Sequence, residues 1–203
     1  MTRAWTTFSI QTVPFFFLAL VSMFVGFQFS SSSAGSNLLP VMLVGLLLFA
    51  ALITFKKTRG WNIALLLSLA LVLGFIIGVL LSSENKSEAP VVVLRTLFLL
   101  LVAALIGSLL GQRSAYFGVS LWVASWVHVF GWVIIMIAQL SFEFIRIWAV
   151  IGLIIFTGLA VVWFGRLEDH LVETTGPTLA IDLYFLSINL SIVIFILSGT
   201  NGS

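Results

Sequence analysis

The sequence predicts an all-helical membrane protein in which seven transmembrane helices form one bundle. Of its 203 residues, 61% are hydrophobic and only 8% are charged, whereas about a quarter of the residues in a soluble domain are charged. The mean hydropathy of +1.25 agrees with this composition. The apolar runs are long and continuous and lack the alternation of barrel strands. Helices are therefore expected, because each satisfies its own backbone hydrogen bonds in lipid.

Seven apolar runs supply the expected spans, each close to the ~20 residues that a helix needs to cross the hydrocarbon. They cover residues 13–29, 38–55, 63–81, 91–110, 116–140, 145–164 and 177–197, with a polar linker at 165–176. Pro14, Pro90 and Pro177 lie at expected helix starts, where the missing N–H group does no harm. The short connections predict antiparallel neighbours in a single domain over residues 1–203.

The first run has two interpretations. Arg3, the apolar stretch and the small residues around Ala34 are typical of a cleaved signal peptide. The same residues are also long and apolar enough for a retained first helix, which is the expectation here. Under that reading the segment is the first of the seven spans.

Basic residues between the runs predict the orientation. The N-terminal side carries Arg3, Lys56, Lys57, Arg59, Arg113 and Arg166. The opposite side carries Lys86, with Arg95 and Arg146 just inside helix ends. Since cytoplasmic loops are enriched in Lys and Arg, the N-terminus is expected on the cytoplasmic side. With seven crossings, the C-terminus lies on the opposite side.

Several functional classes are disfavoured by the sequence. It contains no cysteine, which excludes disulfides, thiolate metal sites and catalytic thiols. It has no HExxH, P-loop or GxSxG motif and no His–carboxylate cluster at metal spacing. No basic cluster is large enough to follow a nucleic-acid backbone. We expect no enzyme, no cofactor and no nucleic-acid partner.

Polar side chains inside the spans are costly in lipid and are therefore the candidate functional residues. Asp182 lies well inside the last span and shares a helix face with Asn189. One reading is a cation pathway formed by these two residues with Glu168 and Asp169. The alternative is structural: Asp182 forms an ion pair with Arg166, and Asn189 makes interhelical hydrogen bonds.

Three further features lie within the expected helices. His128, in the fifth span, is either a proton-sensitive or ligand-binding residue or a histidine bonded within the bundle. Gly74 and Gly78 form a small-xxx-small pair that allows close helix packing. The tryptophans divide into two sets. Trp5, Trp61, Trp148 and Trp163 fall near expected interfaces, whereas Trp122, Trp126 and Trp132 form an aromatic face in the fifth span.

Three segments resemble the Bax inhibitor motif family of seven-helix membrane proteins. The first is Leu39-Pro40, the following apolar run and the basic stop at residues 56–59 (KKTR). The second is residues 151–158 (IGLIIFTG). The third and most specific is residues 183–190 (LYFLSINL), which is similar to the family's Leu-Tyr-Leu-Asp-Phe-Ile-Asn-Leu run.

This resemblance implies six helices around a central C-terminal helix. It also implies a pH-sensitive calcium leak in some members and an interaction with a membrane-bound protease in some bacterial members. The family's leak is associated with an aspartate pair. The matching positions here hold Leu186 and Trp163, so the chain resembles a divergent member that lacks this pair.

Three functional hypotheses follow. The first is a cation leak or membrane-homeostasis regulator of the Bax inhibitor type. The second is a non-conducting accessory, assembly or regulatory subunit of a larger membrane complex, for which the missing aspartates and the tryptophan-rich fifth span argue. The third is a haem or pigment binder that uses His128.

Overall fold

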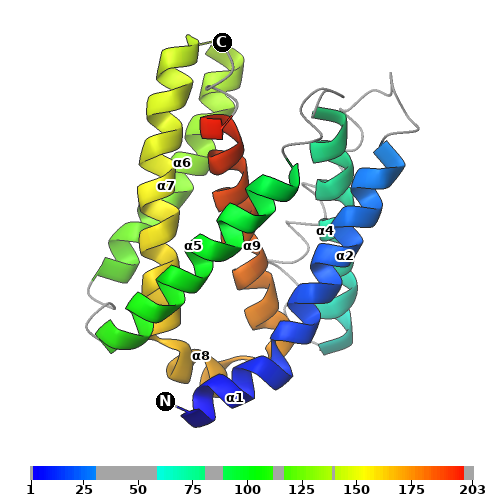
Figure 1. The fold of residues 1–203 in the computed structure, drawn as a ribbon, viewed down its shortest axis with the longest axis vertical. Helices are drawn as coiled ribbons and strands as arrows, with labels where there is room; N and C mark the ends of the chain where they lie inside the picture. The colour runs from blue at the N-terminus through cyan, green and yellow to red at the C-terminus, as the bar shows by residue number, and fades with distance from the viewer. Residues whose placement is uncertain (1, 31–58, 81–88, 112–116, 139, 199–203) are drawn as a thin grey trace. The chain divides into compact units, whose positions relative to one another are not determined.

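The computed structural model describes residues 2–30, 59–80, 89–111, 117–138 and 140–198, shown as coloured ribbon in Figure 1. The regular elements in these ranges are all helices. They are α1 (Thr2–Gln11), α2 (Val13–Ser30), α4 (Arg59–Leu80), α5 (Ala89–Leu110), α6 (Gly118–Ala138), α7 (Phe142–Gly165), α8 (Leu167–Glu173) and α9 (Gly176–Ser198). The span expected at residues 38–55 lies outside the described residues.

Two segments differ from the sequence-based expectation. The linker expected at residues 165–176 contains the short helix α8. Its first turn holds Glu168 and Asp169, and acidic side chains at a helix N-terminus are favoured by the helix dipole. The second difference is α1, which precedes the first expected span. It is separated from α2 near Thr12 because Pro14 has no N–H group to continue the helical hydrogen bonds.

Within the described residues, four helices are long and apolar enough to cross a membrane. They are Ala4–Gly26, Val91–Leu110, Phe142–Gly165 and Gly176–Ser198. Trp61–Val72 in α4 is a shorter apolar stretch. Length and composition thus indicate a helical, multi-pass integral membrane protein. The expected count of seven spans goes beyond what these residues determine.

The described chain divides into two compact units. The first contains residues 1–86 and 170–184, and the second contains residues 87–169 and 185–203. The division falls within α8 and within α9, so each of these helices contributes to both units. The expectation of a single domain remains a prediction.

In the first unit, α2 lies beside α4 along most of its length (Figure 1). Two glycines allow this approach. A Cβ atom at Gly26 would lie 2.0 Å from the Leu71 carbonyl oxygen, and one at Gly74 would lie 1.9 Å from the Met23 carbonyl oxygen. The two backbones are therefore in direct contact, and the Ser22 hydroxyl adds a 2.7 Å hydrogen bond to the Leu67 carbonyl.

The start of α9 also belongs to the first unit. A Cβ atom at Gly176 would lie 2.0 Å from the carbonyl oxygen of Gln11, so α9 begins directly against the end of α1. The Asn62 side-chain amide donates a 3.3 Å hydrogen bond to the Thr178 hydroxyl. This bond ties the beginning of α4 to the beginning of α9.

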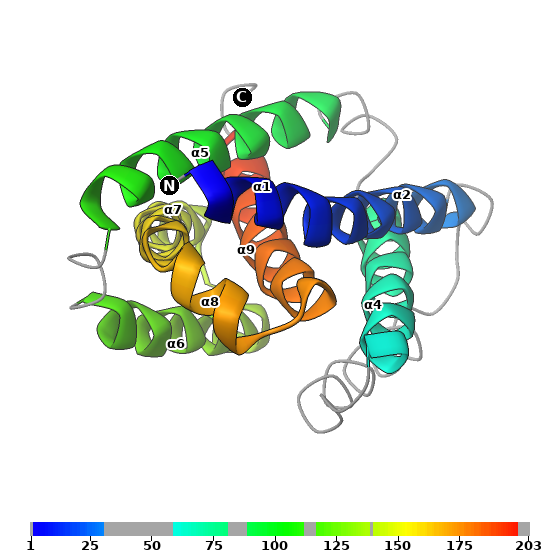
Figure 2. The same ribbon diagram turned by 90° about the horizontal axis from the view of Figure 1, so that it is seen from below.

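In the second unit, α7 lies between α5 and α6, as Figure 2 shows. The contact of α5 with α7 is close: a Cβ atom at Gly107 would lie 2.4 Å from the Val161 carbonyl oxygen. The C-terminal part of α9 packs on these helices, where the Phe185 ring contacts both Trp126 and Phe156. This unit carries most of the membrane-depth polar groups discussed below.

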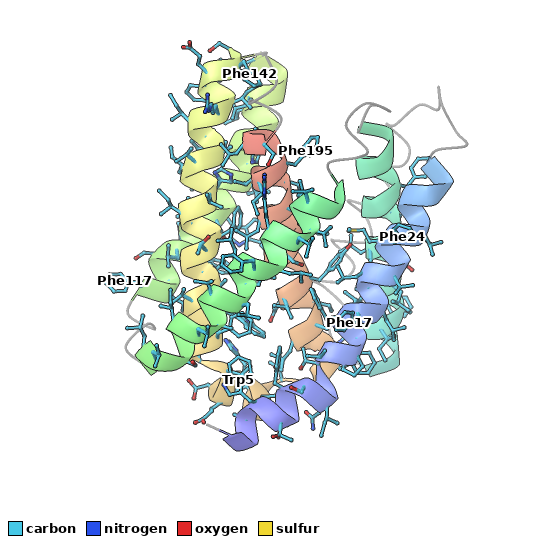
Figure 3. All side chains as sticks on the ribbon, in the orientation of Figure 1. Trp5, Phe17, Phe24, Phe117, Phe142 and Phe195 are labelled. Atoms are coloured by element: carbon cyan, nitrogen blue, oxygen red, sulfur yellow. The ribbon has the colours of Figure 1, made fainter. Side chains whose placement is uncertain are left out.

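Many large apolar side chains project outward from the helices (Figure 3). Phe17 and Phe24 do so from α2, and Phe117 and Phe142 do so near the starts of α6 and α7. A water-soluble domain rarely exposes such large apolar area. Contact with the lipid bilayer accounts for these side chains.

Candidate functional sites along α6 and α9

His128 lies in an aromatic cage in the second unit. Its side chain is 1% exposed. The Trp148 indole of α7 stacks on the imidazole with ring centroids 5.0 Å apart and an interplanar angle of 9°. Phe156 of α7 and Trp132 of α6 both meet the imidazole edge-on. The cage is thus formed by side chains of two neighbouring helices.

The hydrogen bonds of the cage define the state of His128. The Trp132 indole Nε1–H donates to His128 Nε2 at 3.0 Å. Because an indole nitrogen only donates, Nε2 must hold a lone pair and the imidazole is neutral with its proton on Nδ1. Trp148 Nε1–H donates at 3.3 Å to the His128 carbonyl oxygen. Trp148 therefore holds both the ring and the backbone of this residue.

Little room remains around the imidazole. A Cβ atom at Gly152 would lie 2.3 Å from His128 Nε2 and 2.5 Å from Cε1. Among the described residues, the buried Nδ1 has no hydrogen-bond partner. An axial metal ligand needs an unoccupied imidazole nitrogen that faces the metal, whereas Nε2 accepts from Trp132 and Nδ1 is sealed. The geometry thus favours a packing role for His128 over ligation of a haem or pigment.

The polar side chains of the C-terminal part of α9 are directed to protein partners. The Asn189 amide donates a 2.8 Å hydrogen bond to the Phe185 carbonyl oxygen of its own helix. The Ser191 hydroxyl lies 3.0 Å from the Thr96 hydroxyl of α5, which also donates to the Val92 carbonyl. Ser187 is buried. The Ser191–Thr96 contact thus joins α9 to α5, as expected of polar residues in lipid. The interhelical hydrogen bond expected of Asn189 is not what the structure shows, because its amide bonds a carbonyl one turn earlier in α9.

The acidic candidates belong to different units. Asp182 lies in the half of α9 that belongs to the first unit and is half-buried. Glu168, Asp169 and Asn189 belong to the second unit. Arg166 Nε lies 3.4 Å from Asp169 Oδ2, an ion pair at the start of α8. The pairing of Arg166 with Asp182 and the four-residue cation pathway would each join the two units, and both remain predictions.

Two tryptophans expected near the membrane interfaces pack against protein rings in the second unit. Trp148 stacks on His128, and Trp163 is buried. Each packs against a protein ring, because Trp163 meets Phe164 edge-on at 4.9 Å. Sequence position alone could not reveal this, since an indole near a helix end suits both lipid headgroups and a helix interface.

An aromatic groove runs along the outer surface of α6. It has a volume of about 490 Å³ and is lined by Trp122, Val123, Trp126, Val127, Phe130, Gly131, Ile134 and Trp148. A Cβ atom at Gly131 would lie 2.2 Å from the Trp148 ring, so Gly131 admits this indole. Trp122 and Trp126, expected to form a packing face, lie in this groove. Trp132 instead points to His128.

The structure also adds Thr96 and Phe156, which the sequence did not single out, and gives Trp148 a contact beyond its expected interface role. Thr96 of α5 meets Ser191, and Trp148 and Phe156 of α7 meet His128. The only signal of Thr96 and Phe156 in the sequence is their residue type within an apolar span. Within the described ranges, no three His, Asp or Glu side chains gather closely enough to hold a metal ion.

Comparison with known proteins gives no assignment. The sequence matches no protein-family model and no curated protein. The resemblance of residues 39–59, 151–158 and 183–190 to the Bax inhibitor motif family therefore stays a prediction.

Proposed function

We propose that this chain is a seven-helix integral membrane protein that acts as a non-conducting accessory or regulatory subunit of a larger membrane complex. The proposal depends on one observation: polar groups within the apolar helices of the second unit form hydrogen bonds to other groups of the protein. His128, Asn189 and Ser191 each bond to a neighbouring group of the protein. Of these three bonds, the Ser191–Thr96 contact joins α9 to α5, whereas the bonds of His128 and Asn189 lie within their own helices. Polar groups engaged in this way leave little to replace the hydration shell of a passing ion.

The aromatic groove on α6 supports the same proposal. Trp126 lies near the middle of α6, whereas lipid-facing tryptophans concentrate at the two membrane interfaces. Tryptophan is also enriched in the contact regions between proteins. A helix of a partner subunit packed along α6 would give these rings a function at that depth.

The proposal includes the two expectations that go beyond the described residues. The span at 38–55 brings the number of crossings to seven, with α2, α4, α5, α6, α7 and α9 as the other six. α9 has the largest share of buried residues among the candidate spans, 56% against 22–39% for the others. This share supports a central C-terminal helix, as in the Bax inhibitor motif family.

Site-specific photocrosslinking in native membranes tests the subunit role. The photoreactive residue is placed at Val127 in the α6 groove and, as a matched control, at Leu105 on α5, since both side chains are 58% exposed. We expect one discrete protein adduct from position 127 and only lipid adducts from position 105. The subunit role is rejected if both positions yield lipid alone and the protein purifies in mild detergent as a monomer.

A cation leak of the Bax inhibitor type is the second candidate. It is favoured by Asp182, a half-buried acid and the one charged residue of α9, because intramembrane acids commonly mark ion pathways. Cation flux into proteoliposomes separates the two candidates. A subunit without a conduction role gives the flux of empty vesicles, whereas a leak exceeds it and is reduced in Asp182→Asn.

A further inference from the structure

A second groove in the same unit combines an apolar channel with a cationic mouth. Its volume is about 610 Å³. The apolar lining comes from Leu94, Phe98, Leu99, Leu153, Ile194 and Leu197, and the two polar lining residues are Arg95 and Ser198. α5, α7 and α9 therefore each contribute to one surface feature.

Arg95 is held at one end of this groove. Its guanidinium donates a hydrogen bond to the Ser198 hydroxyl. Arg95 lies about 9 Å beyond the start of α5 at the helical rise per residue, and Ser198 is the last residue of α9. The mouth of the groove thus lies in the N-terminal part of α5 and at the C-terminal end of α9.

The mouth has the chemistry of an anion site. Within the described residues, Arg95 has no carboxylate close enough for an ion pair. A guanidinium carries five N–H donors, so the bond to Ser198 leaves donors for a further acceptor. Since the Ser198 oxygen accepts from Arg95, its own O–H is left to donate to the same anion. Guanidinium groups match phosphate geometry particularly well.

We propose that this groove binds an anionic phospholipid, with its phosphate on Arg95 and Ser198 and an acyl chain along the apolar lining. The cationic Arg95 would pair with the lipid phosphate, and the apolar lining would hold an acyl chain that extends towards the bilayer centre. Basic pockets between transmembrane helices bind lipid headgroups in this way. The site does not depend on the proposed subunit role, and it requires only that these helices lie in a bilayer.

Native mass spectrometry of the full-length protein, released from detergent micelles, tests the site. Phosphatidylglycerol and phosphatidylcholine with identical acyl chains are compared as ligands. We expect preferential retention of phosphatidylglycerol and a roughly tenfold weaker retention in Arg95→Gln, as the loss of a charge-assisted hydrogen bond implies. Arg146→Gln is the matched control, because Arg146 is an exposed arginine near the start of α7 that does not line the groove.

A second pair of variants tests the apolar channel. Leu153→Trp fills the groove and should also reduce retention, whereas Ile154→Trp adds the same ring at a 67% exposed position outside it and should leave retention unchanged. This pair decides the question if Arg95→Gln does not fold. Glycerol phosphate, a headgroup without chains, should not compete.

Four results overturn the proposal. They are equal retention of the two lipids by the wild type, equal losses in Arg95→Gln and Arg146→Gln, equal losses in the two tryptophan variants, and full competition by glycerol phosphate. The last result would indicate a site for a free phosphate group.

Discussion

The imidazole of His128 occupies the space where a side chain at position 152 would lie. A Cβ atom there would be 2.3 Å from His128 Nε2. The ring cannot move aside easily, because Trp148 stacks on one face and Trp132 donates to Nε2. Position 152 is therefore restricted to glycine by a rigid neighbour.

We expect Gly152→Ala to lower the free energy of unfolding by about 1–3 kcal/mol, the usual cost of overpacking a core. Unfolding of the detergent-solubilised protein by SDS titration measures the change. Gly158→Ala is the matched control in the same helix, because its Cβ would meet only the mobile end of Leu121 at 3.3 Å. In a His128→Ala background the cost of Gly152→Ala should disappear. An equal cost in both backgrounds would show that another contact limits position 152.

The sequence predicted His128 as a residue of interest but not its surroundings. The sequence grouped Trp132 with Trp122 and Trp126, whereas Trp132 lies one turn from His128 and donates to it, because residues four apart are neighbours on a helix. Trp148 and Phe156 come from α7, and no periodicity states which face of one helix meets another. The aromatic cage around His128 could therefore be identified only from the packing of α6 against α7.

α2 and α4 form the closest helix pair of the first unit, and their glycines set the distance between them. The Cβ of an alanine at position 74 would lie 1.9 Å from the Met23 carbonyl oxygen. This oxygen belongs to a helical backbone and cannot rotate away as a side chain would. The two helices would have to separate along their contact.

We therefore expect Gly74→Ala to destabilise the protein by about 1–3 kcal/mol or more. Ser68→Ala, on the exposed face of α4, should change stability by no more than about 0.5 kcal/mol. The midpoint of thermal unfolding in detergent compares the two variants with the wild type. Similar midpoints for both variants would contradict the close α2–α4 contact.

The elements could be predicted well where hydrophobic runs are long. α4, α5, α7 and α9 occupy the spans expected at residues 63–81, 91–110, 145–164 and 177–197, with differences of at most four residues at their ends. α8 was missed because four of its seven residues are acidic or histidine and because it is shorter than a membrane span requires. Such a short helix is stabilised by its contacts, which a single sequence does not reveal.

At the scale of the whole molecule, the distribution of basic residues and the number of spans together predict on which side of the membrane each terminus lies. If the predicted seven spans are present, six crossings before residue 177 return the chain to the side of the N-terminus, and the seventh places the C-terminus opposite. An even total would place both termini on one side. The lipid site proposed at Arg95 shares this dependence, because its leaflet follows from the same count.

Single-cysteine labelling tests this topology directly, since the natural sequence has no cysteine and needs no background substitutions. A cysteine replaces Thr2, Ser141, Glu173 or Ser203, one at a time. In intact cells of the host, a membrane-impermeant maleimide should label positions 141 and 203 from outside. Positions 2 and 173 should react only after the membrane is permeabilised, because the basic loops predict that this side faces the cytoplasm. Labelling of positions 2 and 203 from the same side would exclude seven crossings. Labelling of 2 and 173 from outside, with 141 and 203 protected, would keep the count and reverse the orientation.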